Sequence, residues 1–361
     1  MSPLLLARQR LAGQHLVDPG FDDPVQVVAA LGAVQAQDFA GAKWAVAQRA
    51  TGLAERDVEQ AFIDGSIVRT HLLRPTWHFV AAEDLRWIQA LTSPRVHAVN
   101  AYQYRQMGVD AALVRRSHAV LEQVLQGGEA LTRTEISAAW QRAGIATGDA
   151  LRVGCLLMWA ELDAPICSGP RRGKQFTYAL VDERLPPTPP LDRDEALAEL
   201  ARRYFATRGP ATLHDFAWWS GLTLTEGKRA VGMLGPALAQ QELGGATYWF
   251  AEPMRAVPSR VRPVHLLPNY DEFFIGFRDR SAMLQRVGAS GLPNPSQTVF
   301  ANVVAIDGQL VGGWTREIGA RGATVTVKLA ASLVPSEQRA VEGAAQRYGR
   351  FLGLPVTLAT V

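Results

Sequence analysis

One order of expected elements occurs three times along the chain and constrains the fold more than any other feature. In each copy, apolar helical segments are followed by a turn, another helix and short strands around a polar loop. This is the order of elements in a winged helix-turn-helix. The 361 residues exceed one simple core, because domains usually hold about 100–200 residues. We therefore expect an α+β fold with three tandem winged-helix modules.

The clearest copy covers residues 191–258. Apolar residues at helical spacing predict an amphipathic helix over 194–205. Thr223 to Glu226 match the capping-box pattern, in which the two side chains bond to each other's backbone N–H groups at the start of a helix. A strand is expected over 246–250, where aromatic and β-branched residues gather.

The second module covers residues 101–190 and repeats this order. Thr132 to Glu135 form another capping box, and a longer helix is expected over 149–162. Two strands follow, joined by a basic loop with glycines, which suits a wing beside a phosphate backbone. A solvated hairpin tip explains the same loop equally well. The expected strands are 166–167 and 176–180, and the candidate DNA contacts in the loop are Arg171, Arg172 and Lys174.

The first module covers residues 1–100, and the last hundred residues, 259–361, change character. Strand-like segments dominate this C-terminal part, Asp307-Gly308 is a tight hairpin signal, and a helix closes it. We expect a β-rich domain there, either barrel-like or a curled sheet. In the first module the expected helices are 3–13, 24–34, 42–50 and 56–64, and the strands 67–71 and 76–80; in the last part the strands are 264–267, 298–300, 303–306, 309–311 and 324–329, and the helix 336–351.

Composition excludes several classes of protein and favours a cytoplasmic one. No apolar run approaches the roughly 20 residues of a membrane span. Cys155 and Cys167 lack paired metal-ligand spacing, and the seven histidines form no H-x-x-x-H pattern, so we expect no metal and no cofactor. Only four of the 37 basic residues are lysines. This bias suits phosphate binding by arginine, but a GC-rich genome explains it as well.

The segment Gln35-Ala36-Gln37-Asp38 follows an apolar helical run and carries the strongest chemical signal. On a helix, side chains two residues apart point about 200° away from each other. The two glutamines therefore converge on one substrate only where the backbone is extended or turning. Without such a turn, they are two solvated glutamines at a helix end.

Along essentially its whole length, the chain resembles the AlkZ and YcaQ group of tandem winged-helix DNA glycosylases. Residues Thr76-Trp77-His78-Phe79-Val80 belong to one of the segments that carry the resemblance. The longest and most specific are Gly209 through Gly221 and Leu266 through Arg280. The segments are 34–38, 76–80, 209–221 and 266–280.

The resemblance implies that Gln35 and Gln37 are the catalytic residues. The family motif is a glutamine, an apolar residue, and then glutamine or aspartate. Glutamine at the second position, as in Gln37, is similar to the AlkZ branch, which unhooks bulky adducts and crosslinks. Asp38 is a further candidate, because a one-residue shift of the backbone presents a carboxylate instead. His78 is a candidate for ordering the water, and a hydrogen-bonded structural histidine is the alternative.

The implied activity is hydrolysis of the N-glycosidic bond of N7-alkylated guanine in double-stranded DNA. Such a base is cationic and leaves readily, so the enzyme mainly has to place a water beneath C1′, which amide groups do well. No lysine lies beside the motif to form a Schiff base. We therefore expect a monofunctional glycosylase that works as a monomer.

Further candidate DNA contacts lie outside the motif. They come from the first wing, from the segment 269–271, and from an arginine-containing loop over 315–322. Each has a structural alternative, such as capping a turn or forming a hairpin tip. The residues are His71, Arg74, Asn269, Tyr270, Asp271, Arg316 and Arg321.

Two other functions compete with this interpretation. Helix-turn-helix modules are often readers of DNA, so a winged-helix regulator or a DNA-damage-binding protein without catalysis is the main alternative. A metal-dependent nuclease or deaminase is the second, and it lacks the histidine and cysteine spacing that such enzymes need.

Overall fold

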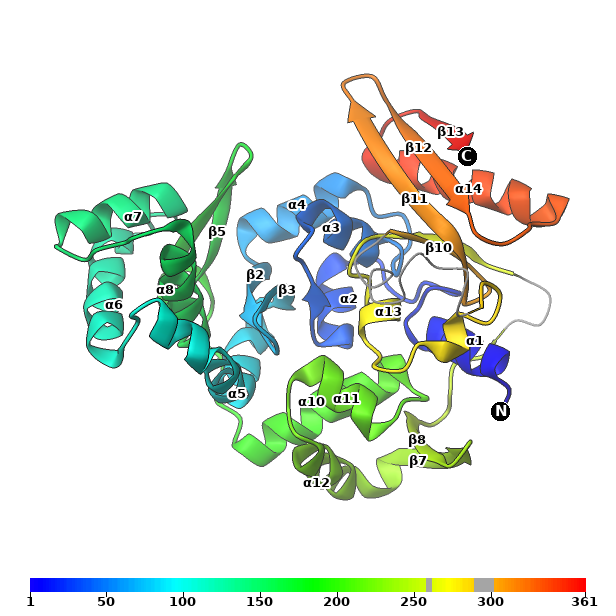
Figure 1. The fold of residues 1–361 in the computed structure, drawn as a ribbon, viewed down its shortest axis with the longest axis horizontal. Helices are drawn as coiled ribbons and strands as arrows, with labels where there is room; N and C mark the ends of the chain where they lie inside the picture. The colour runs from blue at the N-terminus through cyan, green and yellow to red at the C-terminus, as the bar shows by residue number, and fades with distance from the viewer. Residues whose placement is uncertain (258–261, 289–301) are drawn as a thin grey trace. The chain divides into compact units, whose positions relative to one another are not determined.

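The computed structural model describes residues 1–257, 262–288 and 302–361 (Figure 1). The chain forms two compact units, each of which combines helices with strands, so the α+β expectation is confirmed. Unit 1 contains residues 1–59, 198–219 and 223–361, and unit 2 contains residues 60–197 and 220–222. Within the described residues, no helix is long and apolar enough to cross a membrane. The four successive domains expected above remain a prediction.

Unit 2 contains a helix-strand-helix-helix-strand-strand series. Its three strands form a sheet in the order β4-β6-β5, beside the three helices in Figure 1. A β-hairpin and a long helix precede the series. The elements are β2 (Ile67–Leu72), β3 (Thr76–Ala81), α5 (Leu85–Gln106), α6 (Ala111–Leu125), β4 (Leu131–Thr132), α7 (Arg133–Arg142), α8 (Ala150–Leu162), β5 (Ile166–Arg172), β6 (Gln175–Leu180) and α9 (Val181–Arg184).

Local caps and one apolar core explain this series. The capping box of Thr132 and Glu135 starts α7 as expected, and Asp149 accepts two N–H groups at the start of α8. Between the helices, Leu121, Trp140 and Leu156 are completely buried. Helices of this length depend on such packing for most of their stability.

Unit 1 brings the start of the chain together with its last two fifths. The helices α4, α10 and α11 include residues of both units. The elements are α1 (Pro3–Gly13), α2 (Pro24–Leu31), β1 (Val34–Gln35), α3 (Phe39–Ala47), α4 (Glu55–Asp64), α10 (Arg193–Arg208), α11 (Leu213–Ser220), α12 (Leu224–Leu234), β7 (Leu238–Leu243), β8 (Ala246–Ala251), β9 (Val264–Leu267), α13 (Glu272–Ile275), β10 (Val303–Ile306), β11 (Gln309–Gly319), β12 (Gly322–Leu329), α14 (Pro335–Leu352) and β13 (Val356–Thr360).

The described C-terminal strands form an open five-stranded sheet, so the β-rich expectation is confirmed and no closed barrel is seen among the described residues. The strand order is β13-β12-β11-β10-β9, and β13 and β9 are the two edges. All neighbours pair antiparallel except β12 and β13, which are parallel. Helix α14 packs Val341, Ala345 and Tyr348 into the same core as the buried strand residues. A helix on the sheet buries its apolar face, so the strands need not close on themselves.

Several elements differ in length from the expectation. The Asp307-Gly308 turn is confirmed, with φ values of 56° and 76°, as a tight hairpin requires. The segment expected as a loop over 315–322 belongs mostly to β11 and β12, and only residues 320 and 321 lie between them. The expected strand at 298–300 lies outside the described residues. Neither α5 nor β13 was expected from the sequence.

Candidate active site and DNA-contacting residues

The motif segment lies between two helices that both end at identifiable residues. Gly32, with a φ of 76°, ends α2 three residues earlier than expected. The chain is extended at Val34–Gln35 in β1 and bends at residues 37 and 38. The side chain of Asp38 then caps α3 by accepting the N–H of Gly41 at 3.0 Å. The backbone therefore has the extended and turning form that two convergent glutamines need.

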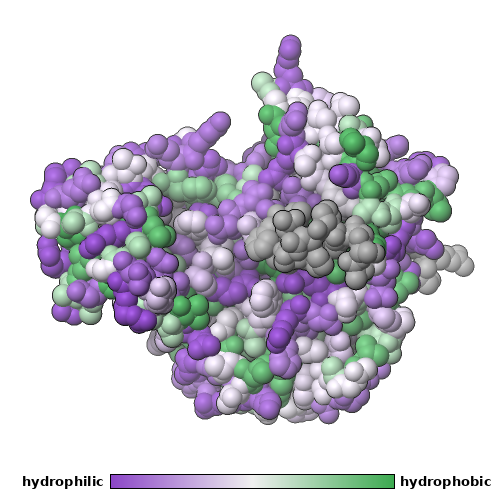
Figure 2. All heavy atoms as spheres, in the orientation of Figure 1, coloured by the Kyte–Doolittle hydropathy of each residue, from purple (hydrophilic) through white to green (hydrophobic). Residues whose placement is uncertain are grey.

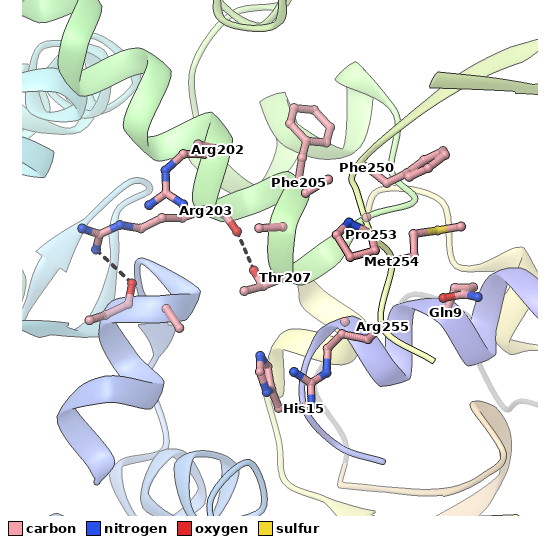
Figure 3. Close-up of a pocket in the computed structure, with 16 residues that line it drawn as sticks. Gln9, His15, Arg202, Arg203, Phe205, Thr207, Phe250, Pro253, Met254 and Arg255 are labelled. Carbon is pink, nitrogen blue, oxygen red and sulfur yellow. Dashed lines mark hydrogen bonds between the residues drawn. The ribbon is translucent and has the colours of Figure 1, made fainter. Parts of the chain in front are cut away.

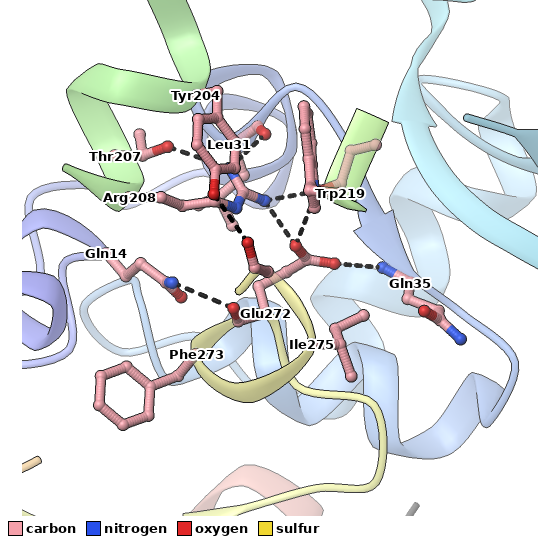
Figure 4. A network of polar contacts seen from close by, with 12 residues as sticks. Gln14, Leu31, Gln35, Tyr204, Thr207, Arg208, Trp219, Glu272, Phe273 and Ile275 are labelled. Atoms are coloured by element: carbon pink, nitrogen blue, oxygen red, sulfur yellow. Dashed lines mark hydrogen bonds and ion pairs between the residues drawn. The ribbon is translucent and has the colours of Figure 1, made fainter. Parts of the chain in front are cut away.

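A buried carboxylate holds the backbone of Gln35 (Figure 4). The N–H of Gln35 donates to Oε1 of Glu272 at 2.9 Å, and Glu272 is completely buried at the start of α13. In Figure 4 the side-chain amide of Gln35 extends away from Glu272. A residue far away in the sequence thus fixes the backbone of the motif through its N–H group.

The other oxygen of Glu272 binds two donors. Arg208 donates to Oε2 at 2.6 Å, and Nε1 of Trp219 donates to the same oxygen at 2.9 Å. The Arg208 guanidinium lies 4.3 Å from the centre of the Trp219 ring. A charge of this kind is stable in the interior only when it is paired and its hydrogen bonds are satisfied.

Arg208 also reaches the chain just before the motif. Its guanidinium donates to the carbonyl of Leu31 at 2.9 Å and to the carbonyl of Ala33 at 3.3 Å. The segment from Leu31 to Gln35 is therefore held on its carbonyl side by Arg208 and on its N–H side by Glu272. This ion pair therefore contributes to the position of the motif.

Asp271 continues this buried network and has a structural role. It is 2% exposed, its two oxygens pair with Arg49 at 2.8 and 3.0 Å, and it caps α13 by accepting the N–H of Phe273. Capping a turn was the structural alternative for this residue. Its neighbours Asn269 and Tyr270 are half-buried.

The two glutamines differ in exposure. Gln35 is 6% exposed, whereas Gln37 lies at the surface. Both oxygens of Asp38 have partners, because Oδ1 caps α3 and Oδ2 pairs with Arg316 at 2.9 Å. The motif thus contains one buried amide, one exposed amide and a carboxylate in an ion pair.

Two histidine candidates in unit 2 are buried. Nδ1 of His71 lies 2.5 Å from Oε2 of Glu161, and the two residues are 7% and 1% exposed. The His71 ring also contacts the ring of Trp77, with centroids 4.5 Å apart. Nδ1 of His78 donates to the carbonyl of Thr76 at 2.9 Å, and His78 is completely buried.

The basic candidates at the hairpins are more exposed. Lys174 lies in the turn between β5 and β6, and Arg321 lies in the turn between β11 and β12. Figure 2 shows hydrophilic side chains at the tip of the β11–β12 hairpin. Arg172 forms an ion pair with Glu135, Arg171 lies over the ring of Phe176, and Arg74 is half-buried.

Sequence reasoning missed Glu272, Arg208 and Trp219. One signal was present, because Glu272 precedes the apolar run Phe273-Phe274-Ile275. A carboxylate inside a buried segment implies a cationic partner. Within the described residues, no cluster of three or more His, Cys, Asp or Glu side chains is placed to hold a metal ion.

Comparisons with known proteins show the family and the fold of the chain. A family model described as "DNA glycosylase AlkZ-like" matches residues 28–351. The interstrand DNA cross-link repair glycosylase of Streptomyces sahachiroi is 25% identical over 309 residues, which are 80% of this chain and 81% of that protein. The solved structure of Streptomyces sahachiroi DNA glycosylase AlkZ aligns with 99% of this chain and all of that one, with a TM-score of 0.76 and 21% identity. The structural likeness shows a shared fold.

Proposed function

Because the chain belongs to the AlkZ-like DNA glycosylase family, we propose that it hydrolyses the N-glycosidic bond of N7-alkylated guanine in double-stranded DNA. One observation carries the proposal. The buried Arg208–Glu272 pair holds the Gln35 backbone extended, which is the backbone form that two glutamines two residues apart need to face one substrate. Placement of this kind is what a reaction with a good leaving group requires.

In the proposed reaction, Gln35 and Gln37 position one water beneath C1′ of the damaged nucleotide. The water oxygen forms a bond to C1′ while the bond from C1′ to N9 breaks. The departing base takes the electron pair and becomes neutral, and the water releases a proton to solvent. Amide oxygens stabilise the positive charge that develops on the sugar. An abasic site remains in the DNA.

We assign the water to the glutamines rather than to Asp38 or His78. The pairing of Asp38 with Arg316 and with the Gly41 N–H supports a structural role for this carboxylate. The burial of His78 and its bond to the Thr76 carbonyl support the same for the histidine.

We further propose that residues 1–100, 101–190 and 191–258 form three winged-helix modules, and that the tips of the β5–β6 hairpin and of the β11–β12 hairpin in the C-terminal sheet contact DNA phosphates. The exposure of Lys174 and Arg321 supports them as contacts. Replacing either by alanine is expected to leave stability unchanged and to reduce the slope of log K against log salt concentration by about 1. An unchanged slope would remove that residue from the interface.

The substrate range is proposed to include bulky adducts and interstrand crosslinks, because the Streptomyces relative is described as a cross-link repair glycosylase. A series of duplexes that carry N7 adducts of increasing size tests this point. Release of N7-methylguanine alone would restrict the enzyme to small lesions.

The decisive experiment measures base release from a duplex that contains N7-methylguanine. Gln35→Ala and Gln37→Ala are each expected to slow release by about 100-fold or more. Gln338→Ala, an exposed glutamine on α14, is the matched control and should behave as wild type.

Three results would contradict the proposal. Equal release by wild type and the double variant would remove the glutamines from the reaction. Duplex binding without any base release would instead indicate a DNA-binding protein without catalysis. Release of uracil or unmodified guanine at the same rate would contradict the dependence on a cationic leaving group.

A further inference from the structure

A pocket of about 630 Å³ lies in unit 1, away from the residues discussed so far. It is bounded by α3, β9, α14 and the chain that follows α1. Pockets that hold small molecules usually measure about 300–1,000 Å³. Its apolar lining includes Trp44, Leu53 and Phe351. The size and the lining fit a small organic molecule.

Two arginines at this pocket have no carboxylate partner. Arg347 and Arg350 are both exposed on α14, three residues apart, which places them on one side of the helix. Arg347 donates to the carbonyl of Val264. In residues 1–257, 262–288 and 302–361, neither arginine forms an ion pair. A third arginine, Arg262, is paired with Glu337 at 3.6 Å.

His265 of β9 adds a buried polar group to the pocket lining. It is 6% exposed, and its Nε2 atom has no hydrogen-bond partner in the part of the chain that the structure describes. Burial, followed by the charges of Arg347 and Arg49, lowers the pKa of His265 to about 3. The ring is therefore neutral near pH 7. Buried polar atoms nearly always have a partner, so we expect this nitrogen to take its hydrogen-bond partner from outside the chain.

A second pocket in unit 1, of about 500 Å³, differs from the first in how its arginines are paired (Figure 3). It also contains three arginines, but each of them has a carboxylate partner within the protein. Arg202 and Arg203 both bond to Glu199 at 2.7 Å, and Arg255 lies 3.4 Å from Asp18. Only the pocket beside α14 combines unpaired cations with a buried unpartnered imidazole among the described residues.

We propose that the pocket beside α14 binds a small organic anion with an apolar, aromatic body. The anionic group lies against Arg347 and Arg350, the body lies against Trp44 and Phe351, and His265 supplies one hydrogen bond. Charge-assisted bonds to arginine give the anionic group its selectivity. This site is separate from the proposed glycosylase chemistry.

Gly343 allows a direct test, because it lines the pocket on α14 and its added Cβ would meet no described atom within 4 Å. Gly343→Leu therefore adds an apolar side chain at the pocket wall, in a position where its Cβ has room. Gly232→Leu on α12 is the matched control, because a Cβ there also meets nothing within 4 Å. For the charges, Arg347→Gln combined with Arg350→Gln is compared with Arg339→Gln, an exposed arginine of α14 outside the pocket.

The experiment titrates the full-length variants with anilinonaphthalene sulfonate and with the neutral N-phenylnaphthylamine. One sulfonate is expected to bind per chain. Gly343→Leu should abolish binding of both probes. The double arginine variant should weaken the sulfonate about tenfold and leave the neutral probe unchanged. Both controls should match wild type.

Undiminished binding by Gly343→Leu would overturn the proposal. Equal loss of both probes in the double arginine variant would also overturn it, because the site would then lack selectivity for anions. Affinity for an undamaged duplex is measured in parallel. If the double arginine variant loses duplex affinity and keeps the sulfonate, the arginines contact DNA phosphates and the pocket assignment fails.

Discussion

The backbone N–H of Gln35 donates to Oε1 of Glu272 at 2.9 Å, across 237 residues of chain. Glu272 is held in turn by Arg208 and Trp219. The position of the motif therefore depends on a buried ion pair from distant parts of the sequence. A site of this design is sensitive to residues that never touch the substrate.

Glu272→Gln is expected to impair both stability and base release. The neutral amide leaves the Arg208 charge in the interior without its counter-charge, at a cost of about 3–5 kcal/mol in the free energy of unfolding. Urea unfolding and base release are measured on the same preparations. Glu199→Gln is the control, because that carboxylate is partly exposed and its loss costs at most about 1 kcal/mol. Wild-type stability in Glu272→Gln would contradict the role assigned to the pair.

Two substitutions of Asp38 test whether its carboxylate is structural or catalytic. Asp38→Asn keeps the cap on α3 and loses only the ion pair with Arg316, so unfolding changes by less than about 1 kcal/mol. Asp38→Ala also loses the cap and is expected to cost about 1–2 kcal/mol. Base release by Asp38→Asn should stay within a few-fold of wild type. A fall of about 100-fold at unchanged stability would identify the carboxylate as catalytic.

His71 is expected to affect stability rather than DNA affinity. Replacing it by phenylalanine leaves the buried Glu161 carboxyl group without its partner, which costs about 3–5 kcal/mol. Adding Glu161→Met should restore most of the lost free energy of unfolding, because an apolar pair then replaces the polar one. Thermal unfolding and duplex titrations distinguish the effects. A fall in affinity without a fall in stability would return His71 to the DNA interface.

Acid should destabilise the folded chain through His265. Its pKa is lowered from 6.5 to about 3 by burial and by neighbouring arginines. The unfolded state therefore binds a proton in a range where the folded state does not. The contribution of His265 to the free energy of unfolding is fully present above pH 6.5. It falls by roughly 1 kcal/mol per pH unit as the pH drops toward 3. His265→Leu should flatten the dependence in urea unfolding, and the exposed His214→Leu should not. Parallel curves for all three proteins would refute this origin.

Local signals predicted local structure well. The capping boxes at Thr132 and Thr223 start α7 and α12, and the Asp307-Gly308 turn joins β10 and β11. These patterns act through bonds within a few residues, so one sequence suffices to recognise them.

The missed elements depend on distant partners. Strand β13 pairs in parallel with β12, and nothing in its own residues indicates that partner. Helix α5 contains Pro94, which a local rule treats as a helix break. The open sheet has the same explanation, because closure depends on which edges meet.

The candidate site was predictable only in part. Residue types and the family resemblance pointed to Gln35 and Gln37, and the extended backbone agrees with what they need. The ion pair of Arg208 and Glu272 was not predictable, because its members come from segments that only the fold brings together. For His71 and Asp271, burial favours a structural role over contact with DNA. A short sequence motif does not reveal whether its residues are buried.

The interrupted path of unit 1 has a consequence for synthesis on the ribosome. All of unit 2 except residues 220–222 is the contiguous stretch 60–197, so most of this unit can condense while translation continues. The first 59 residues belong to unit 1 and wait for chain made much later. Because Glu272 anchors Gln35, the nascent protein can form this anchor of the proposed active site only after three quarters of it has been made, and no product that ends before Glu272 can form it.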